Sequence, residues 1–363
     1  MKVLHLSSES TWRGGEQQII YLVEETRKLG VEAIVGCRRG SAVEKYCQVN
    51  NLPYRSLRFK SAYDIFTAIK VVQYCRREDV DLIQTHTSKS HTMAVIAGLL
   101  GLKTPQILTR RVDFPIKNNW FSRFKYNYQK IRKVICISET IYNMTAVDIR
   151  DKSKLITIHS GVDTGKFVPF FKSDWLRKKY GLSQETVVIG NTSAISDQKD
   201  YYTFVKVAEV LISQKRDVRF FIVGDGPDRE AIEQFTNDRG LQDVVTFTGF
   251  VENITEVLPS LDIFLFTSKT EGLGTSVLDA MAAHVPIVAT AAGGVSEMVE
   301  HLENGLLYQV KDVDGLTVGV NLLLSDPDLG ISLAKKAELT VRNFSKEKTA
   351  KSSYELYKEI LNS

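Results

Sequence analysis

Apolar and polar positions follow two periods along this chain. Short apolar runs typical of buried strands are separated by longer segments in which apolar residues recur every three or four positions, as in helices. In the first half, strands are expected at residues 3–7, 33–37, 54–58, 82–86, 106–110, 134–138 and 155–159, with helices at 16–29, 64–77 and 90–100. In the second half, strands are expected at 187–191, 219–223, 244–248, 263–267, 287–291 and 306–310. This alternation predicts an α/β fold with two parallel sheets, each covered by helices on both faces.

A loop-forming segment separates the two halves. Residues 160–169 contain two glycines and a proline after the last strand of the first half, a composition typical of a linker. A chain of 363 residues is also longer than a single core usually fills. We therefore predict an N-terminal domain at residues 1–166 and a C-terminal domain at 167–345. An amphipathic helix at about 346–363 is expected to pack back on the first domain.

The two predicted domains differ in charge. Lys and Arg outnumber Asp and Glu by 27 to 15 in residues 1–166, whereas residues 167–363 carry 20 against 28. The net charge of +4 therefore hides a basic half and an acidic half. A basic domain is expected to face an anionic partner. Charge alone leaves nucleic acid, a membrane and a phosphorylated substrate open as that partner.

The composition favours a cytoplasmic protein. Hydrophobic residues make up 43% and charged residues 25%, and no apolar run approaches the roughly 20 residues that span a bilayer. Residues 1–6 enter a strand directly, without the layout of a signal peptide. The cysteines have no metal-ligand spacing and are expected to be reduced structural thiols: Cys37, Cys47, Cys75 and Cys136.

The segment at 271–282 says most about function. It follows the expected strand at 263–267 and combines a Gly-containing turn with the start of a helix. Free amides at a helix start favour a bound anion, and the carboxylates of Glu271 and Asp279 can bind neutral hydroxyls. A ligand with phosphate and polyol parts suits this arrangement. The alternative is an ordinary capped turn between a strand and a helix.

Motifs at several expected strand ends together resemble the retaining glycosyltransferases of family 4, which have the GT-B fold of two Rossmann-like domains facing across a cleft. The resemblance covers nearly the whole chain. The motifs are Gly14-Gly15-Glu16, Thr85-His86, Gly161-Val162-Asp163 with Phe167, Ser196-Asp197-Gln198-Lys199, Val223-Gly224-Asp225-Gly226-Pro227, Thr248-Gly249-Phe250, residues 271–282, and Gly293-Gly294-Val295-Ser296-Glu297. The resemblance implies an N-terminal acceptor-binding domain and a C-terminal domain that binds the nucleotide sugar.

The resemblance also implies an activity. It predicts a retaining, hexosyltransferase-type enzyme that moves a sugar from a nucleotide-diphosphate sugar to a glycan or lipid-linked acceptor, in the biosynthesis of cell-surface polysaccharide, lipopolysaccharide or glycolipid. No metal and no cofactor is expected, because Asp79-Val80-Asp81 and Asp312-Val313-Asp314 do not follow strands at good metal positions. Sugar transfer is expected to be a front-face displacement, in which the leaving diphosphate helps to deprotonate the acceptor.

Three positions near the expected reacting centre take roles from the resemblance. Gly14-Gly15 would lie beside the donor diphosphate, and Lys199 would contact and neutralise it. His86 would lie near the sugar and the reacting centre. The alternatives are a tight turn for the glycines, a solvated surface lysine and a structural histidine.

Other roles concern the donor in the second domain. Glu271 would contact hydroxyls of the donor sugar. Asp279 would contact the ribose, at a position where the family more often has glutamate. Further donor contacts are implied for Gly274, Thr275, Ser276 and Glu297. For Glu297, a helix-capping role is an equally simple interpretation.

One departure from the family concerns the phosphate site. The family usually carries an arginine five positions before the lysine, where this chain has Ala194. A second phosphate-binding cation is therefore missing from its expected place. Arg110 or Arg111, at the end of a first-domain strand, is a candidate substitute.

A basic, aromatic segment characterises the acceptor side. Residues 103–133 contain nine Lys and Arg and one acid, Asp113, interleaved with aromatic residues. We expect peripheral contact with an anionic membrane at the inner face of the cell membrane, with Lys125 and Lys133 among the contributing cations. The alternative is that the aromatic residues pack in the core and the basic face is merely solvated. Nucleic acid is not an expected partner.

Other function classes fit the motifs less well. A sugar-nucleotide epimerase of similar fold fits the acidic motif at 271–282 and the hinge segment less well. A nonenzymatic nucleotide-binding protein would leave Lys199, Glu271 and His86 without a shared purpose. A two-domain dehydrogenase would need a Gly-x-Gly-x-x-Gly motif after a strand, which Gly14-Gly15 does not provide.

Overall fold

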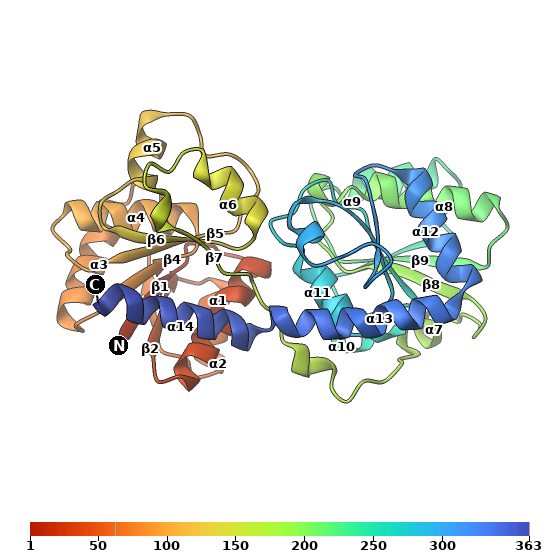
Figure 1. The fold of residues 1–363 in the computed structure, drawn as a ribbon, viewed down its shortest axis with the longest axis horizontal. Coiled ribbons are helices and arrows are strands. Elements are labelled where there is room, and N and C mark those ends of the chain that lie inside the picture. The colour runs from red at the N-terminus through yellow and green to blue at the C-terminus, as the bar shows by residue number, and fades with distance from the viewer. Residues whose placement is uncertain (62, 363) are drawn as a thin grey trace. The chain divides into compact units, whose positions relative to one another are not determined.

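The computed structural model describes residues 1–61 and 63–362 and separates into two compact units (Figure 1). The first unit contains residues 1–162 and the C-terminal segment that begins at Ser345. The second unit is Asp163–Phe344. The sequence analysis placed the boundary after residue 166, which lies within a 3₁₀ turn, Thr164–Phe167, of the second unit.

The first unit is built on a parallel sheet with the order β3-β2-β1-β4-β5-β6-β7. Its strands are β1 (Lys2–Leu6), β2 (Glu32–Arg38), β3 (Tyr54–Leu57), β4 (Leu82–Thr85), β5 (Gln106–Arg110), β6 (Ile131–Cys136) and β7 (Leu155–Thr157). Its helices are α1 (Gly14–Lys28), α2 (Ala42–Val49), α3 (Ile65–Arg77), α4 (Ser88–Leu99), α5 (Trp120–Tyr126), α6 (Glu139–Ala146) and α14 (Lys346–Asn362).

Helices cover both faces of this sheet, because successive strand residues point to opposite sides. Val3 packs in a core with α1, α2 and α14, whereas Leu4 and Leu6 pack in a second core with α3 and α4. Helix α14 runs alongside α1 (Figure 1), and its Tyr357 is fully buried. The C-terminal helix therefore completes the core of the first unit.

The second unit is built on a parallel sheet with the order β10-β9-β8-β11-β12-β13. Its strands are β8 (Val187–Asn191), β9 (Val218–Val223), β10 (Val245–Gly249), β11 (Ile263–Phe266), β12 (Ile287–Thr290) and β13 (Leu306–Tyr308). Its helices are α7 (Trp175–Tyr180), α8 (Tyr201–Ser213), α9 (Arg229–Asn237), α10 (Ile254–Val257), α11 (Thr275–Ala282), α12 (Val313–Ser325) and α13 (Pro327–Val341). Residues of α8, α9 and α12 share one core with the strands.

These two sheets confirm the predicted fold class of two parallel, Rossmann-like α/β domains. Each expected strand corresponds to one observed strand. The largest difference is in β6, which begins at Ile131 rather than at residue 134. Within the described part of the chain, no helix combines the length and the apolar character that crossing a bilayer requires.

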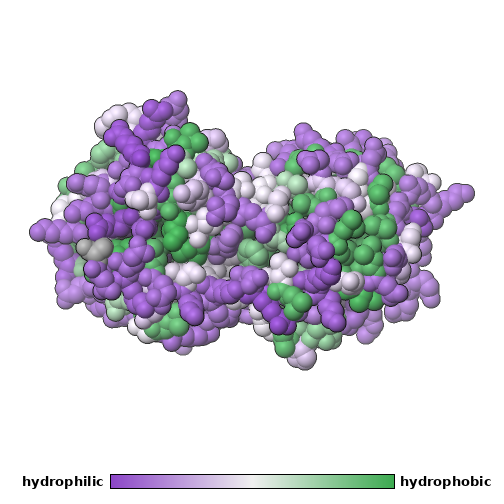
Figure 2. Space-filling model, viewed as in Figure 1, coloured by the Kyte–Doolittle hydropathy of each residue, from purple (hydrophilic) through white to green (hydrophobic). Residues whose placement is uncertain are grey.

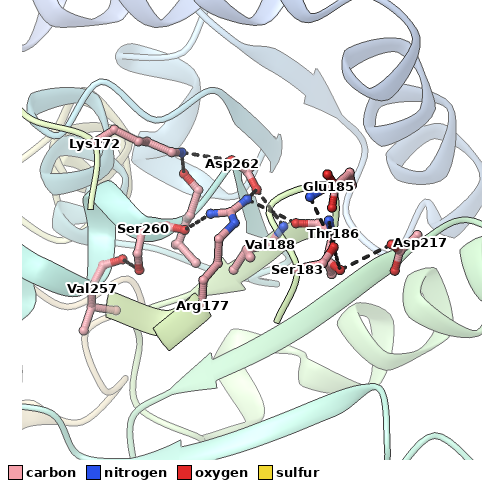
Figure 3. A network of polar contacts seen from close by, with 11 residues as sticks. Lys172, Arg177, Ser183, Glu185, Thr186, Val188, Asp217, Val257, Ser260 and Asp262 are labelled. Carbon is pink, nitrogen blue, oxygen red and sulfur yellow. Dashed lines mark hydrogen bonds and ion pairs between the residues drawn. The ribbon is translucent and has the colours of Figure 1, made fainter. Parts of the chain in front are cut away.

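A polar network ties together the amino ends of β8 and β11 (Figure 3). Asp262, directly before β11, accepts hydrogen bonds from Arg177 Nη2 at 2.6 Å and from the backbone N–H of Val188 at 2.8 Å. Its other carboxylate oxygen lies 2.9 Å from Lys172 Nζ. Ligands of open parallel sheets bind at the opposite, carboxyl ends of the strands. The network therefore contributes to the stability of the second unit and not to its ligand site.

The surface is mostly hydrophilic, with separate hydrophobic areas (Figure 2). One of these areas lies on the second unit, on the side of α12 and α13 (Figure 2). Val318 and Ile331, on these two helices, are 62% and 66% exposed. Scattered exposed apolar residues of this kind are ordinary in folded proteins.

Candidate active site

In each sheet the strand order reverses at one point, and the predicted site residues other than Glu297 follow the strands at that point. In the second unit, β8 and β11 are neighbours, and the chain continues outward from them in opposite directions. Ligands of open α/β sheets bind at such switch points, at the carboxyl ends of the strands. Lys199 lies in the loop after β8 and Glu271 in the loop after β11.

Lys199 and Glu271 are brought into direct contact. The ammonium group of Lys199 forms an ion pair with Glu271 Oε1, and Ser268 Oγ donates a hydrogen bond of 2.7 Å to the same oxygen. The side chains of Lys199 and Glu271 are 19% and 11% exposed. A cation suited to phosphate and a carboxylate suited to hydroxyls therefore lie side by side, partly open to solvent.

Backbone contacts hold the two loops together. The hydroxyl of Thr267 donates to the carbonyl oxygens of Lys199 and Asp200, both at 3.1 Å. The backbone N–H of Lys269 donates to the carbonyl of Gln198 at 2.7 Å. Because these bonds fix the backbone on both sides, the Lys199–Glu271 pair is a rigid feature of the second unit.

The glycine pair after β12 packs against the backbone of the Glu271 loop. Gly293 has a φ of +53°, and a Cβ there would lie 2.2 Å from the carbonyl oxygen of Glu271. The backbone N–H of Gly294 donates to that same oxygen at 3.2 Å. Glycine is therefore required at 293 for both conformation and space. Glu297 ends the 3₁₀ turn that this pair begins, Gly293–Glu297, and is half-buried.

Helix α11 begins directly after the Glu271 loop. Gly274 occupies its N-cap position with a φ of +90°, and no side chain caps this end. The first amides of a helix have no intrahelical acceptor, so those of Thr275 and Ser276 can bind an anion. Ser276 Oγ lies 3.2 Å from Ser193 Oγ in the loop after β8. The start of α11 thus borders the same loops as Lys199 and Glu271.

Asp279, one turn further along α11, has a cationic partner. Lys166 Nζ lies 2.7 Å from Asp279 Oδ1, and both side chains are 23% exposed. Burial raises the pKa of Asp279 above its usual value, and Lys166 opposes this shift. Lys166 was not among the predicted site residues. Its contact with α11 depends on the fold of the 3₁₀ turn Thr164–Phe167, which the sequence pattern does not indicate.

The missing family arginine is not replaced by Arg110. Ala194, at the expected position, is exposed in the loop after β8. Arg110 is buried in the first unit, where it donates to Tyr126 Oη at 2.9 Å and to the carbonyl of Phe114. Arg111 donates to Ser160 Oγ at 2.7 Å. Of the two candidates, only Arg111 lies beside the predicted site residues of the first unit.

Gly14 and Gly15 are the first two residues of α1 rather than part of a preceding turn. No atom lies within 4 Å of a Cβ placed on Gly15. The space beside this backbone is therefore open, and the amides of a helix start border it. The strand order reverses between β1 and β4, so this helix start and His86 follow the two strands of the switch point.

His86 is buried and contacts a second histidine. Its Nε2 lies 3.1 Å from His5 Nδ1, and within the described structure its Nδ1 has no hydrogen-bond partner. Burial, together with the charges of His5 and Arg111, lowers the pKa of His86 well below its usual value. His86 is therefore neutral near pH 7.

The sequence analysis gave His5 no role. A polar residue in the middle of an apolar strand was the signal that could have indicated it. His5 lies in β1, next to β4 in the sheet, and is fully buried. The charge of Arg111 acts on the pKa of both His86 and Glu16, which lies at the start of α1, so these groups are near one another. The first unit thus gathers its predicted residues in one region.

Two family descriptions match the chain. Residues 173–359 match Glycosyl transferases group 1, and residues 12–166 match Glycosyltransferase Family 4. The chain is 25% identical over 311 residues to N-acetyl-alpha-D-glucosaminyl L-malate synthase of Bacillus anthracis, covering 82% of this chain and 80% of that protein. It is 23% identical over 352 residues to the lipopolysaccharide core biosynthesis glycosyltransferase LpsE of Rhizobium meliloti, covering 96% of each.

The fold has a similar counterpart among solved structures. The crystal structure of HepE from Anabaena in complex with UDP and glucose matches with a TM-score of 0.88 at 22% identity, over 99% of this chain and 100% of that chain. This likeness confirms the predicted GT-B fold class. Since the group 1 family covers more than half of the sequence, including Lys199 and Glu271, the chain belongs to the group 1 glycosyl transferases and is a glycosyltransferase.

Proposed function

We propose that this glycosyltransferase moves a sugar from a nucleotide-diphosphate sugar to a glycan or lipid-linked acceptor, with retention at the anomeric carbon. The contact between Lys199 and Glu271 is the observation that carries the proposal. A single ligand with a phosphate beside a sugar hydroxyl can engage both groups at once. Relatives support this chemistry: the HepE structure contains UDP and glucose, and LpsE is named for lipopolysaccharide core biosynthesis.

In this proposal the second unit binds the donor. Lys199 neutralises charge that accumulates on the departing nucleoside diphosphate, together with the free amides at the start of α11. Glu271 accepts hydrogen bonds from hydroxyls of the donor sugar, and Asp279 accepts them from the ribose. The leaving diphosphate takes the proton of the acceptor hydroxyl on the face it departs from. The protein then contributes positioning and electrostatics, and we assign no metal or cofactor to the step.

The first unit supplies the acceptor side. His86 contributes a neutral imidazole, which can hydrogen-bond to a sugar or acceptor hydroxyl without adding positive charge beside Arg111. Gly14 and Gly15 provide backbone amides for the diphosphate. These roles stay predictions until variants are measured.

Nucleotide binding tests the proposal first. The protein is heated with UDP, ADP, GDP and dTDP and with their sugars, and free nucleotide release is then scored for the sugars that stabilise it. One ligand at a hundred times its dissociation constant should stabilise the fold by about 2.7 kcal/mol. Glu271→Ala should keep the fold and lose transfer. The absence of any response to nucleotides or their sugars would reject the donor assignment.

Peripheral membrane contact is a second part of the proposal. Lys125 is buried, and Lys133 lies in β6 with its ammonium 3.1 Å from Glu359. Exposed apolar residues occur in the expected segment, where Phe114 and Trp120 are 55% and 78% exposed, and also at the start of α3, where Ile65 and Phe66 are 47% and 74% exposed. Lys70 is exposed on the same helix. Apolar side chains with basic neighbours suit an anionic lipid surface.

Vesicle flotation tests this contact. Phosphatidylglycerol vesicles should carry the wild-type protein to the top of a density gradient, and a double Ile65→Ser, Phe66→Ser variant should remain below. A matched double variant, Val318→Ser, Ile331→Ser, removes equally exposed apolar residues from the second unit and should float like the wild type. Equal flotation of all three proteins would reject this surface.

A further inference from the structure

The first unit contains a pocket with buried cations and no acidic lining. This pocket, of about 660 Å³, lies between α4, α5 and the loop after β5. We call it the α4–α5 pocket. No Asp or Glu occurs among the described residues that line it. Its lining includes the cations Arg110, Lys117 and Lys125 and the aromatic residues Trp120, Phe121 and Tyr126.

Lys125 is buried with only neutral partners. Its side chain is on α5, the residue is 6% exposed, and its Nζ donates to Ser88 Oγ at 3.1 Å and to Thr92 Oγ1 at 3.3 Å. Both hydroxyls belong to α4. The ammonium is therefore hydrogen-bonded, but no carboxylate balances its charge at this site.

Arg110 adds a second buried charge. It is 3% exposed, with its Nη atoms on Tyr126 Oη and the carbonyl of Phe114, and its Nε has no partner among the described residues. Burial lowers the pKa of Lys125 to about 8, and the charges of Arg110 and Lys117 act in the same direction. Buried cations that lie close together repel one another and destabilise the fold, unless a bound anion balances their charge.

Aromatic side chains form a large part of the remaining lining. Trp120 and Phe121 come from α5 and Tyr126 from its last turn. Tyr63 also lines the pocket, with its ring centroid 5.4 Å from that of Phe121. Aromatic walls favour a ligand that carries a flat or apolar group next to its charged group. The pocket thus combines charge recognition with apolar contact.

We propose that the α4–α5 pocket binds an anionic group of the acceptor, a phosphate or a carboxylate that is attached to an apolar chain or a sugar ring. This inference rests on the proposed function and defines the chemical class of its acceptor. Lys125 and Arg110 hold the charge, and the aromatic side chains hold the attached group.

The position of the pocket fits this role. Ser88, which contacts Lys125, lies two positions after His86 in the chain, and Arg110 ends β5, the strand beside β4. An acceptor anchored in the pocket therefore lies next to the region of the first unit where His86 is found. The pocket would select acceptors that carry an anion near the hydroxyl that receives the sugar.

Binding of small probes tests the inference on the whole protein. Calorimetry is carried out with geranyl monophosphate, methyl glucuronide and uncharged methyl glucoside. We expect one of the two anions to bind and methyl glucoside not to bind, and the anion that binds identifies a lipid phosphate or an acidic sugar as the source. Failure of both anions would overturn the inference.

Two variants on α5 make the test specific. Lys125→Met should lower the affinity for the anion that binds by about tenfold or more, the range for a hydrogen bond to a charged group. The same variant should unfold at a higher temperature than the wild type, because it removes a buried charge without a carboxylate partner. Arg123→Met removes an exposed charge from the same helix and should change neither property.

The outcomes also separate this inference from the proposed function. Equal anion affinity in Lys125→Met and wild type, or lower stability of the variant with its anion response intact, would show that Lys125 only links α4 to α5. Nucleotide binding is measured on the wild-type protein in parallel. Its absence would reject the donor assignment, whereas absence of anion binding alone would reject only the α4–α5 pocket as an acceptor site.

Discussion

The ammonium group of Lys199 forms an ion pair with the carboxylate of Glu271 in the second unit. A donor that binds here must offer both of them replacements, a phosphate oxygen for the lysine and sugar hydroxyls for the glutamate. The pair is therefore arranged for a ligand that carries both chemistries. A ligand with only one of them would leave the other charge partly buried without a new partner.

Neutralising either member of this pair should therefore affect transfer more than folding. We expect Glu271→Gln and Lys199→Gln each to reduce the transfer rate by about 100-fold to 1000-fold, the range for loss of one preorganised electrostatic group. Steady-state rates at saturating donor measure this. Lys269→Gln is the matched control, because it breaks an ion pair with Asp197 of 2.6 Å in the same two loops. Near wild-type rates in the first two variants would reject their assignment.

The contact of Gly293 with the Glu271 backbone leads to a second prediction. Gly293→Ala should lower the free energy of unfolding by about 2–4 kcal/mol. Alanine is strained in the left-handed backbone conformation, and its Cβ would clash with the carbonyl oxygen of Glu271. Gly240→Ala is the control, because Gly240 has a φ of +67° but nothing within 4 Å of its Cβ position. Gly240→Ala should lower the free energy of unfolding by only about 1–2 kcal/mol. Urea unfolding compares the two, and equal losses would mean that the close approach at Gly293 relaxes freely.

Much of the fold could be predicted because parallel strands are buried on both faces and therefore appear as apolar runs. The run at 263–267 became β11, Ile263–Phe266, with little change. The start of β6 was missed for the opposite reason. Arg132 is exposed there, and Lys133 forms an ion pair with Glu359 of α14. The first residues of this strand therefore show no apolar pattern.

Site positions at strand ends could be predicted, but their partners could not. Lys199 and Glu271 follow strands that meet at the switch point, and the family resemblance had assigned both of them to the donor. The contacts of His86 with His5 and of Asp279 with Lys166 join segments far apart in the chain. Lys125 was expected on a basic surface and is buried instead. A charge pattern shows that cations are near one another, but not which of them the packing encloses.

The Lys166–Asp279 pair predicts a pH dependence of nucleotide binding. Burial raises the pKa of Asp279 and Lys166 lowers it, so removing Lys166 should raise it further. If the ionised carboxylate binds the ribose, affinity falls as pH falls through this pKa. We expect Lys166→Met to lose nucleotide affinity at a higher pH than wild type does, over titrations from about pH 8 to 5. Lys206→Met, on the exposed face of α8, should titrate like wild type.

His86 should act without changing its charge. Burial lowers its pKa well below the usual value, so it is neutral at pH 7 and above. We expect His86→Gln to reduce transfer by about tenfold to a hundredfold and to leave the shape of the pH–rate profile unchanged. An acidic limb that disappears in the variant would show that His86 titrates during turnover. Histidine ring resonances that shift between pH 5 and 8 and vanish in the variant would show the same.

Asp262 should matter for stability and not for the donor. Its carboxylate faces Arg177, whose side chain is only 7% exposed, at the amino ends of β8 and β11 (Figure 3). Asp262→Asn leaves that guanidinium without its ionic partner. A fully buried pair costs about 3–5 kcal/mol to break, but Asp262 is itself 26% exposed, so we expect a loss of about 2–3 kcal/mol in urea unfolding.

Asp217→Asn provides the matched control for this network. Asp217 is exposed and accepts a long hydrogen bond of 3.3 Å from Thr186 Oγ1 at the edge of the same network (Figure 3). Its replacement should change the free energy of unfolding by no more than about 0.5 kcal/mol. Both variants should bind nucleotide like the wild type, because the network lies at the strand ends opposite Lys199 and Glu271. Weaker nucleotide binding by Asp262→Asn with unchanged stability would mean that this network supports the ligand site across the length of β8 and β11.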